Sequence, residues 1–219
     1  NLIIDLNGEI VMPDTVNAIL TDNSKKEIAV EWQGVDVDAM KKGGIAKYTI
    51  KGFADGMEAI CYVSMVEYNF LENWSFEEGE FGWTATALKS FDELHVEDKV
   101  SDSMTGNKHY HFWGAGKDCV EFTLEQEVSN LKSGIYNYSI SIMGGDGGET
   151  DIYSYVKVNG ETVQRAATDI TVYDEWHTAT INGIHYAEGD SITVGIYVKC
   201  SGPNAWGKID DAMLNSVKE

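Results

Sequence analysis

Hydrophobic and polar residues alternate in short runs along the whole chain. The clearest run is Ser191 to Cys200, in which every second residue from Ile192 to Val198 is aliphatic. Side chains at every second position of a β-strand point to the same face, so this run predicts a strand with one face in a core. No segment shows a helical period over the length of a helix, and we therefore expect an all-β protein.

Residues 1–67 form the first predicted domain. Its expected strands are Glu9 to Met12, Val16 to Leu20, Glu27 to Trp32, Ala46 to Gly52 and Glu58 to Val66. Residues typical of turns, such as Pro13-Asp14 and Asp55-Gly56, separate these strands. Short strands at this spacing predict a small antiparallel sandwich.

Residues 68–219 form the second predicted domain. Its expected strands are Trp83 to Leu88, Leu94 to Glu97, Lys108 to Trp113, Val120 to Val128, Gly134 to Met143, Asp151 to Val158, Ile170 to Tyr173, Trp176 to Ile181, Ser191 to Cys200 and Lys208 to Leu214. A segment of about 150 residues is long enough to bury one core. We therefore expect a single β-sandwich of the jelly-roll type.

The order of these strands predicts which loops meet. If consecutive strands from Lys108 onward run antiparallel, alternate loops lie at the same end of the sandwich. One end then collects the loops 114–118, 144–150, 173–175 and 201–206, which carry or adjoin Trp113, Asp146, Tyr173, Trp176, Asn204 and Trp206. Sugar rings stack their C–H faces on aromatic rings and bond amides and carboxylates through their hydroxyls, so these side chains predict a sugar-binding site.

These candidates differ in strength. Trp206 is the strongest because its loop is short and polar, whereas Trp176 fits a core position equally well. The run Gly144 to Gly148 is either a tight turn or a backbone that lets a sugar approach closely, and without a following helix it cannot be a dinucleotide-binding loop. His109 and His111 could bind a metal, but the sequence offers no third ligand nearby, so we expect His111 at the surface or against the sugar.

Charge and composition narrow the range of partners. The 219 residues include 36 acidic and 16 basic ones, and the resulting net charge of −20 argues against nucleic acid as a partner. No run approaches the roughly 18 apolar residues of a membrane-spanning helix. Cys61, Cys119 and Cys200 match no zinc or redox motif, so we expect free thiols, although Cys119 and Cys200 could pair. We expect the chain to be a soluble part of a larger protein.

Both domains resemble known families. Met12 to Val16, Ile28 to Trp32 and Lys47 to Gly52 are similar to a bacterial immunoglobulin-like domain, which implies a spacer. The second domain resembles the family 61 carbohydrate-binding modules attached to family-53 endo-β-1,4-galactanases. The residues that carry this resemblance are Asn73 to Gly79, Trp83, His109 to Trp113, Gly144 to Asp146, Trp176, Val194 to Lys199 and Ala205 to Asp211. It implies a galactose-binding-like jelly roll that is not catalytic, binds extracellular β-1,4-galactan and holds a parent catalytic domain on pectic side chains.

Chemistry and this resemblance together predict a structural calcium ion. Glu77 and the Asp210-Asp211 pair supply hard oxygen donors near the first and last strands, where modules of this type often hold calcium. Asp210 shares a strand face with Ala212 and Leu214, so we expect its side chain to point inward. The alternative interpretation is a solvated acidic strand end.

Two other functions remain open. A glycosidase would need two carboxylates beside a cleft, one of them with a raised pKa, and Glu97/Asp98, Glu121/Glu125 and Asp146/Glu149 are possible pairs. A cell-surface adhesive or structural pair of β-domains also fits the architecture. We favour the galactan-binding module.

Overall fold

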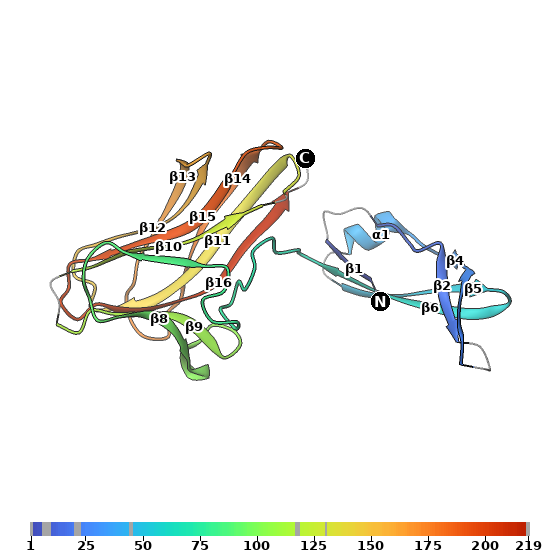
Figure 1. Cartoon of the computed structure of the whole chain (residues 1–219), viewed down its shortest axis with the longest axis horizontal. Helices are drawn as coiled ribbons and strands as arrows, with labels where there is room; N and C mark the ends of the chain where they lie inside the picture. Colours follow the sequence, from blue (N-terminus) through green and yellow to red (C-terminus); the bar gives the residue numbers. More distant parts are fainter. Residues whose placement is uncertain are drawn as a thin grey trace. The chain divides into compact units, whose positions relative to one another are not determined.

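The computed structural model describes residues 2–5, 10–19, 23–43, 46–116, 119–129 and 131–217. Its contacts divide the chain into two units, Asn1–Tyr68 and Asn69–Glu219, whereas the division expected from the sequence follows residue 67. Strands dominate both units (Figure 1), which confirms the all-β prediction. None of the described helices has the length and apolar character needed to cross a membrane.

The N-terminal unit is built on a four-stranded sheet. Its elements are β1 (Leu2–Asp5), β2 (Thr15–Ile19), β3 (Lys25–Ala29), β4 (Glu31–Gln33), α1 (Val37–Lys42), β5 (Ala46–Ala54) and β6 (Met57–Val66). The sheet order is β1-β6-β5-β4, with β1 parallel to β6, and β2 and β3 form a separate hairpin. Val63, Met65 and Ile50 lie in its core, because every second residue of β5 and β6 faces inward.

Three local predictions for this unit were wrong. The structure has a short helix, α1, where none was expected, and it begins where the Asp36 carboxylate accepts a hydrogen bond from the Ala39 amide at 2.8 Å. The expected strand Glu27 to Trp32 is two strands that break at Val30. The expected strand Glu9 to Met12 is absent over residues 10–12, and its residue 9 lies outside the described residues.

The C-terminal unit is a sandwich of two five-stranded sheets. Its strands are β7 (Thr84–Ala87), β8 (Glu93–Asp98), β9 (Lys108–Trp113), β10 (Val120–Val128), β11 (Gly134–Gly145), β12 (Thr150–Val158), β13 (Glu161–Thr168), β14 (His177–Tyr186), β15 (Ile192–Cys200) and β16 (Trp206–Val217), and a 3-10 turn spans Val100–Asp102. We call the sheet ordered β14-β11-β16-β9-β8 the front sheet, and the sheet ordered β13-β12-β15-β10-β7 the back sheet. Figure 1 shows β11 and β16 side by side in the front sheet.

The core of this sandwich lies between the two sheets. The aliphatic residues of β15 that the sequence pattern placed inside, Ile192 to Val198 at every second position, are fully buried. They pack in one cluster with Tyr138 and Ile140 of the front sheet. Burying one such side chain stabilises the fold by about 1.5 to 3 kcal/mol. Cys61, Cys119 and Cys200 are free thiols, as expected.

One strand of this unit was missed and one was predicted wrongly. Ile170 to Tyr173 is not a strand, and only Ile170 of this segment is buried. The missed strand, β13, has a largely exposed sequence at the edge of the back sheet. β13 runs from one end of the sandwich to the other, as the wrongly predicted strand Ile170 to Tyr173 was expected to do. The loops that follow therefore lie at the ends that the strand order predicted.

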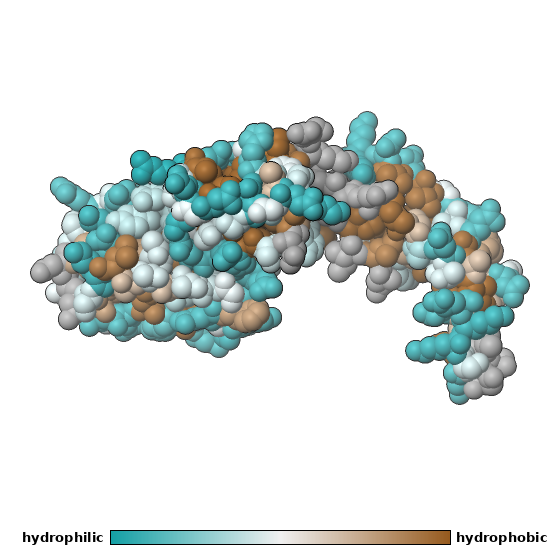
Figure 2. Space-filling view, turned by 45° about the horizontal axis from the view of Figure 1, so that its top comes forward, coloured by the Kyte–Doolittle hydropathy of each residue, from teal (hydrophilic) through white to brown (hydrophobic). Residues whose placement is uncertain are grey.

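Hydrophilic residues cover most of the face of the larger unit that Figure 2 shows. On the face shown in Figure 2, hydrophobic residues of this unit are confined to small separate patches. Trp113, Tyr173 and Trp74 are among its exposed large hydrophobic side chains. Exposed tryptophans present large apolar rings with a polar N–H, which makes them candidates for contact with a ligand.

Candidate functional site

Backbone hydrogen bonds join three loops at one end of the sandwich. The Gly114 amide donates to the Ala205 carbonyl at 2.8 Å, and the Gly202 amide donates to the Gly147 carbonyl at 2.7 Å. A Cβ atom on Gly202 would collide with the main chain of Asp146, so only glycine permits this close approach. The loops that strand parity grouped together therefore meet, and the glycine run serves to pack them.

Trp113 and Trp206 are direct neighbours at this end. Trp113 ends β9, Trp206 begins β16, and the two residues face each other in the antiparallel register of the front sheet. On its other side Trp206 is opposite Gly145 of β11, where a Cβ atom would come within 3.1 Å of the indole ring. The Trp206 indole thus lies across Gly145, and Trp113 stands beside it with 42% of its surface exposed.

Two polar residues surround the Trp206 indole. Its Nε1 donates a hydrogen bond to Asp146 Oδ2 at 3.2 Å. The Tyr173 ring lies 6.4 Å from it, centroid to centroid, at an interplanar angle of 41°. Tyr173 and Asp146 are exposed and Trp206 is partly buried, so two aromatic rings and a carboxylate at this end can stack on a sugar and accept hydrogen bonds from its hydroxyls. We call Trp113, Trp206, Tyr173 and Asp146 the aromatic row.

The remaining sugar-site candidates differ in their placement. Asn204 is exposed in the turn just before Trp206. Trp176 is partly buried just before β14, and among the described residues no hydrogen bond or ring contact links it to the aromatic row. His111 shares the outward face of β9 with Trp113, but only 12% of its side chain is exposed. Burial along this face therefore increases from the end of the sandwich toward its middle, where His109 is fully buried.

His111 and His109 belong to a charged network centred on Lys208. The Lys208 ammonium lies 2.9 Å from Glu97 Oε2, 3.0 Å from His111 Nδ1 and 3.2 Å from Asp102 Oδ2, so each of its three N–H groups has an acceptor. His109 Nε2 lies 3.1 Å from the same Glu97 oxygen. Because Lys208 donates to His111 Nδ1, the proton of neutral His111 sits on Nε2, which lies 3.3 Å from Glu93.

Asp102 links this charged network to the aromatic row. The Tyr173 hydroxyl donates to the Ser101 carbonyl at 3.1 Å and lies 3.3 Å from Asp102 Oδ1. Burial acts to raise the pKa of Asp102, but hydrogen bonds from Lys99, Ser101 and Lys208 outweigh it and hold the pKa well below its usual range. Asp102 is therefore a fixed carboxylate that orients Tyr173 beside Trp206.

A third potential metal ligand, Glu97, lies beside His109 and His111 in the structure. The sequence did not reveal it. Glu97 of β8 is paired with His109 across the strands, and one ligand atom from each of Glu97, His109 and His111 lies within 4.8 Å of the others. Lys208 Nζ sits among these atoms, and its positive charge would repel a cation there. We interpret the group as a hydrogen-bonded charge network and not as a metal centre.

This network predicts that stability depends on pH. Burial and the Lys208 charge lower the pKa of His111 from 6.5 to about 4, against the opposing effect of Glu97, while His95 and His109 lower it further. The unfolded chain takes up a proton below pH 6.5, whereas the folded chain does so only near pH 4. The contribution of His111 to the free energy of unfolding should therefore fall by about 2 to 3 kcal/mol as the pH drops through this window, while buried Asp210, whose pKa is raised to about 7, acts in the opposite direction.

Urea unfolding between pH 7 and pH 4 measures this dependence. His111→Gln should remove the His111 contribution, so its stability relative to the parent should rise as the pH falls, whereas the same change at exposed His185 should leave the slope as in the parent protein. An unchanged slope in His111→Gln would show that the network does not hold His111 neutral.

The connection between β8 and β9 covers the inner half of this outward face. Its amides at Met104 and Thr105 donate to Asp210 Oδ2 at 2.9 and 3.3 Å, and Asp210 is fully buried. Asp210 is opposite Ser141, whereas Met213 is opposite Ser139, so the strand β16 contains a bulge at Asp211 with φ +47°. Asp210 is therefore buried as expected, but on the outward face and not on the face of Ala212.

The side chains of the three predicted calcium ligands do not converge on a single ion position. Glu77 accepts hydrogen bonds from the Asn107 and Lys108 amides at 2.7 and 2.8 Å. Burial acts to raise its pKa, but these bonds lower it overall. Among the described residues Glu77, Asp210 and Asp211 do not form a group with ligand atoms within 4.8 Å of one another.

Asp210 and Asp211 nevertheless fit a cation better than Glu77 does. Burial raises the pKa of Asp210 to about 7 and also raises that of Asp211. Within the described part of the chain, no lysine, arginine or histidine forms an ion pair with Asp210. A hard divalent cation would compensate this buried carboxylate.

In its fold the C-terminal unit is similar to β-sandwich carbohydrate-binding modules. A solved module of this kind, TmCBM61 in complex with β-1,4-galactotriose, is 28% identical to the chain with a TM-score of 0.58, and the match covers 68% of this chain and 99% of that one. Residues 3–57 match the model of the bacterial Ig-like domain, group 4. Both resemblances found in the sequence are thus confirmed.

Two further solved structures are similar at lower identity. The CBM22-1 xylan-binding domain of Xyn10C from Paenibacillus barcinonensis is 21% identical with a TM-score of 0.45, covering 66% of this chain and 92% of that one. A family 16 carbohydrate-binding module is 16% identical with a TM-score of 0.45, covering 68% of this chain and 100% of that one. None of the curated proteins gives a significant match.

Sequence reasoning did not bring together the residues beneath the aromatic row. Lys208, Glu97 and Asp102 lie on β16, β8 and the 3-10 turn, and nothing in their local sequence links them. One available signal was the spacing of Trp206, Lys208 and Asp210 at every second position of one strand. This spacing places Lys208 on the same strand face as two of the predicted site residues.

Proposed function

We propose that the C-terminal unit binds β-1,4-linked galactan through the aromatic row, as a non-catalytic module of a larger secreted glycoside hydrolase. The observation that carries this proposal is the pairing of Trp113 and Trp206 on adjacent strands at an open end of the sandwich. The similarity to a module solved with β-1,4-galactotriose supports galactan as the glycan. The N-terminal unit then acts as a spacer, because its relatives are immunoglobulin-like domains.

The charge states of Glu97 and Glu125, two of the acids considered for catalysis, support a role without catalysis. A glycosidase needs a carboxyl group with a raised pKa beside a cleft. The pKa values of Glu97 and Glu125 are instead lowered, since hydrogen bonds from Lys208 and Lys157 respectively outweigh the effect of burial. Glu121 accepts the Tyr197 hydroxyl at 2.8 Å. A reducing-sugar assay on galactan should accordingly show no release of sugar.

Affinity electrophoresis tests the proposed binding. The full chain should migrate more slowly in a gel that contains β-1,4-galactan than in a gel without polysaccharide, and a xylan gel should leave its migration unchanged. The xylan gel is the control for general affinity toward polysaccharides. Equal migration in all gels would rule out galactan binding and favour a structural or adhesive pair of domains.

We propose in addition that calcium binds at Asp210 and Asp211, with Glu77 fixing the adjacent loop through the Asn107 and Lys108 amides. When bound, the ion would neutralise the buried Asp210 carboxylate. Removing calcium with a chelator should therefore lower the melting temperature by several degrees, and added calcium but not magnesium should restore it. Asp210→Asn should remove the response to calcium. A melting temperature that changes with neither chelator nor calcium would contradict this site.

A further inference from the structure

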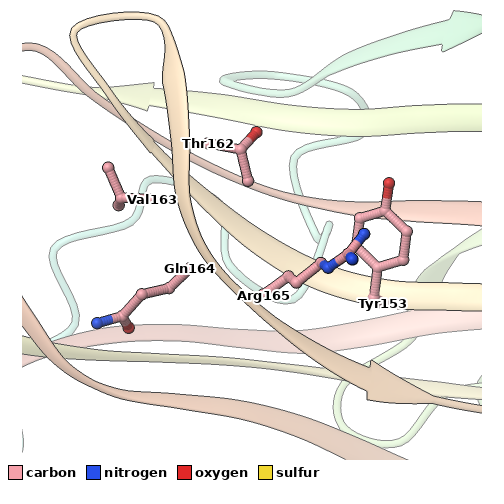
Figure 3. A pocket seen from close by; sticks show the side chains of 5 residues that line it. All are labelled: Tyr153, Thr162, Val163, Gln164 and Arg165. Atoms are coloured by element: carbon pink, nitrogen blue, oxygen red, sulfur yellow. The ribbon is translucent and has the colours of Figure 1, made fainter.

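A second aromatic surface, partly buried, lies on the outward face of the back sheet. Tyr153 of β12 stacks on Tyr197 of β15, with ring centroids 5.0 Å apart and an interplanar angle of 28°. The guanidinium carbon of Arg165, on β13, lies 5.3 Å from the centroid of the Tyr153 ring. These residues adjoin a hollow of about 400 Å³ that is lined by Tyr153, Thr162, Val163, Gln164 and Arg165 (Figure 3).

A bulge in β13 determines which side chains reach this surface. Gln164 is opposite Val156 while Thr162 is opposite Lys157, so Val163 is an extra residue in β13. Without it Thr162 and Arg165 would point to opposite faces, whereas the bulge directs both to the face of Tyr153. Figure 3 shows the Arg165 side chain extending to the Tyr153 ring. Gln164 points away and donates to the Gly183 carbonyl at 3.4 Å.

Among the described residues Arg165 has no carboxylate partner. It is the only arginine in a sequence with 36 acidic residues. Its neighbour Lys157 is bound to Glu125, and the hydroxyls of Tyr155 and Tyr197 donate to Glu125 and Glu121 at 2.6 and 2.8 Å. No carboxylate in the described part of the chain forms an ion pair with Arg165. The guanidinium thus lies against the Tyr153 ring, and because Arg165 is exposed its N–H groups are open to solvent.

We propose that this hollow is a second saccharide-binding site, selective for a sugar that carries a carboxylate, that is, a uronic acid residue. The planar N–H edge of Arg165 matches a carboxylate through two parallel hydrogen bonds. The Thr162 and Tyr153 hydroxyls beside it can bond the ring hydroxyls of the same sugar, and the hollow is open enough to admit one residue of a longer chain. The choice of a saccharide over other carboxylates rests on the proposed function.

This site lies on the other sheet from the aromatic row and differs from it in chemistry. The aromatic row combines indoles with the carboxylate of Asp146, which would repel an acidic sugar. Arg165 offers the opposite charge. The two faces would therefore bind different sugars, neutral at the aromatic row and acidic at Arg165.

Nuclear magnetic resonance of the ¹⁵N-labelled full chain tests the proposal directly. Because the chain has a single arginine, the side-chain Nε–H signal reports on this site alone. Trigalacturonate should shift that signal in a saturable manner with a dissociation constant of about 1 mM. Neutral β-1,4-galactotriose should leave it in place, and acetate at the same concentration should shift it far less.

Variants separate this site from its surroundings. Arg165→Gln should weaken trigalacturonate binding at least about tenfold, followed through the Thr162 backbone amide, and Arg165→Lys should weaken it less because the charge remains. Lys199→Gln removes a positive charge from the same exposed face and should bind as the parent does, which controls for net charge. Trp206→Ala should abolish galactan binding and leave the arginine shift intact.

Three results would overturn the proposal. The first is an Nε–H signal that trigalacturonate does not move. The second is an equal shift with acetate, which would indicate an adventitious ion only. The third is loss of the shift in Trp206→Ala, which would place acidic and neutral sugars at one site. Failure of galactan binding with a persistent arginine shift would instead remove the proposed function and keep an acidic-sugar site.

Discussion

Trp206→Ala should weaken binding to β-1,4-galactotriose by about 30-fold or more, which corresponds to about 2 kcal/mol. The indole lies across Gly145 and is held there by Asp146 and Tyr173, so it presents a fixed ring face. Alanine removes this face and leaves a cleft over Gly145 that water fills. Trp206→Phe keeps an aromatic ring but not the Nε1 donor and should lose less affinity. Isothermal titration calorimetry of the full chain measures both changes.

Trp74→Ala is the matched control for this experiment. Trp74 is exposed to the same extent as Trp113, but its carbonyl accepts a hydrogen bond from Ala212, six residues along β16 from Trp206. At 3.3 Å per residue this distance is about 20 Å, so Trp74 lies outside the aromatic row. Its loss should leave the affinity unchanged. Equal weakening by Trp74→Ala and Trp206→Ala, or no weakening by either, would contradict the assignment of the aromatic row.

Lys208→Met should lower the free energy of unfolding by about 3 kcal/mol or more. Lys208 is almost fully buried, and its ammonium balances Glu97 and Asp102 while it donates to His111. Methionine fills a similar volume but leaves two carboxylates without their shared cation, and breaking such a buried pair is strongly destabilising. Urea unfolding at pH 7 measures the loss.

The same variant has a second readout. Since the Lys208 charge also lowers the pKa values of His109 and His111, the methionine variant should lose part of the pH dependence described above. Lys99→Met is the control, because Lys99 pairs with the same Asp102 from a half-exposed position and should matter little. A small effect of Lys208→Met, equal to that of Lys99→Met, would show that the network does not stabilise the front sheet.

The sandwich can be predicted from the sequence because the evidence for each strand lies within that strand's own residues. Alternating aliphatic residues in β15 and β10 report directly on a buried face, and strand parity then places Trp113 and Trp206 at one end without knowledge of the register. The missed strand β13 shows the limit of this signal. As an edge strand it buries few residues, so its sequence carries almost no hydrophobic period.

The charged network and the acidic pair depend on information that is not local. Lys208 meets Glu97 only because β16, β9 and β8 are neighbours in one particular register, and the two residues are 111 positions apart in the sequence. The orientation of Asp210 was predicted wrongly because a bulge at Asp211 reverses the alternation. A bulge in a long strand changes every face after it, and alternation alone cannot reveal its position.

A crystal structure of the full chain with bound β-1,4-galactotriose tests the central claim most directly. We expect one sugar ring to lie flat on Trp206 or Trp113, with Asp146 and Tyr173 within hydrogen-bonding distance of its hydroxyls. A trisaccharide bound elsewhere, with both indoles free of sugar, would contradict the assignment of galactan binding to the aromatic row.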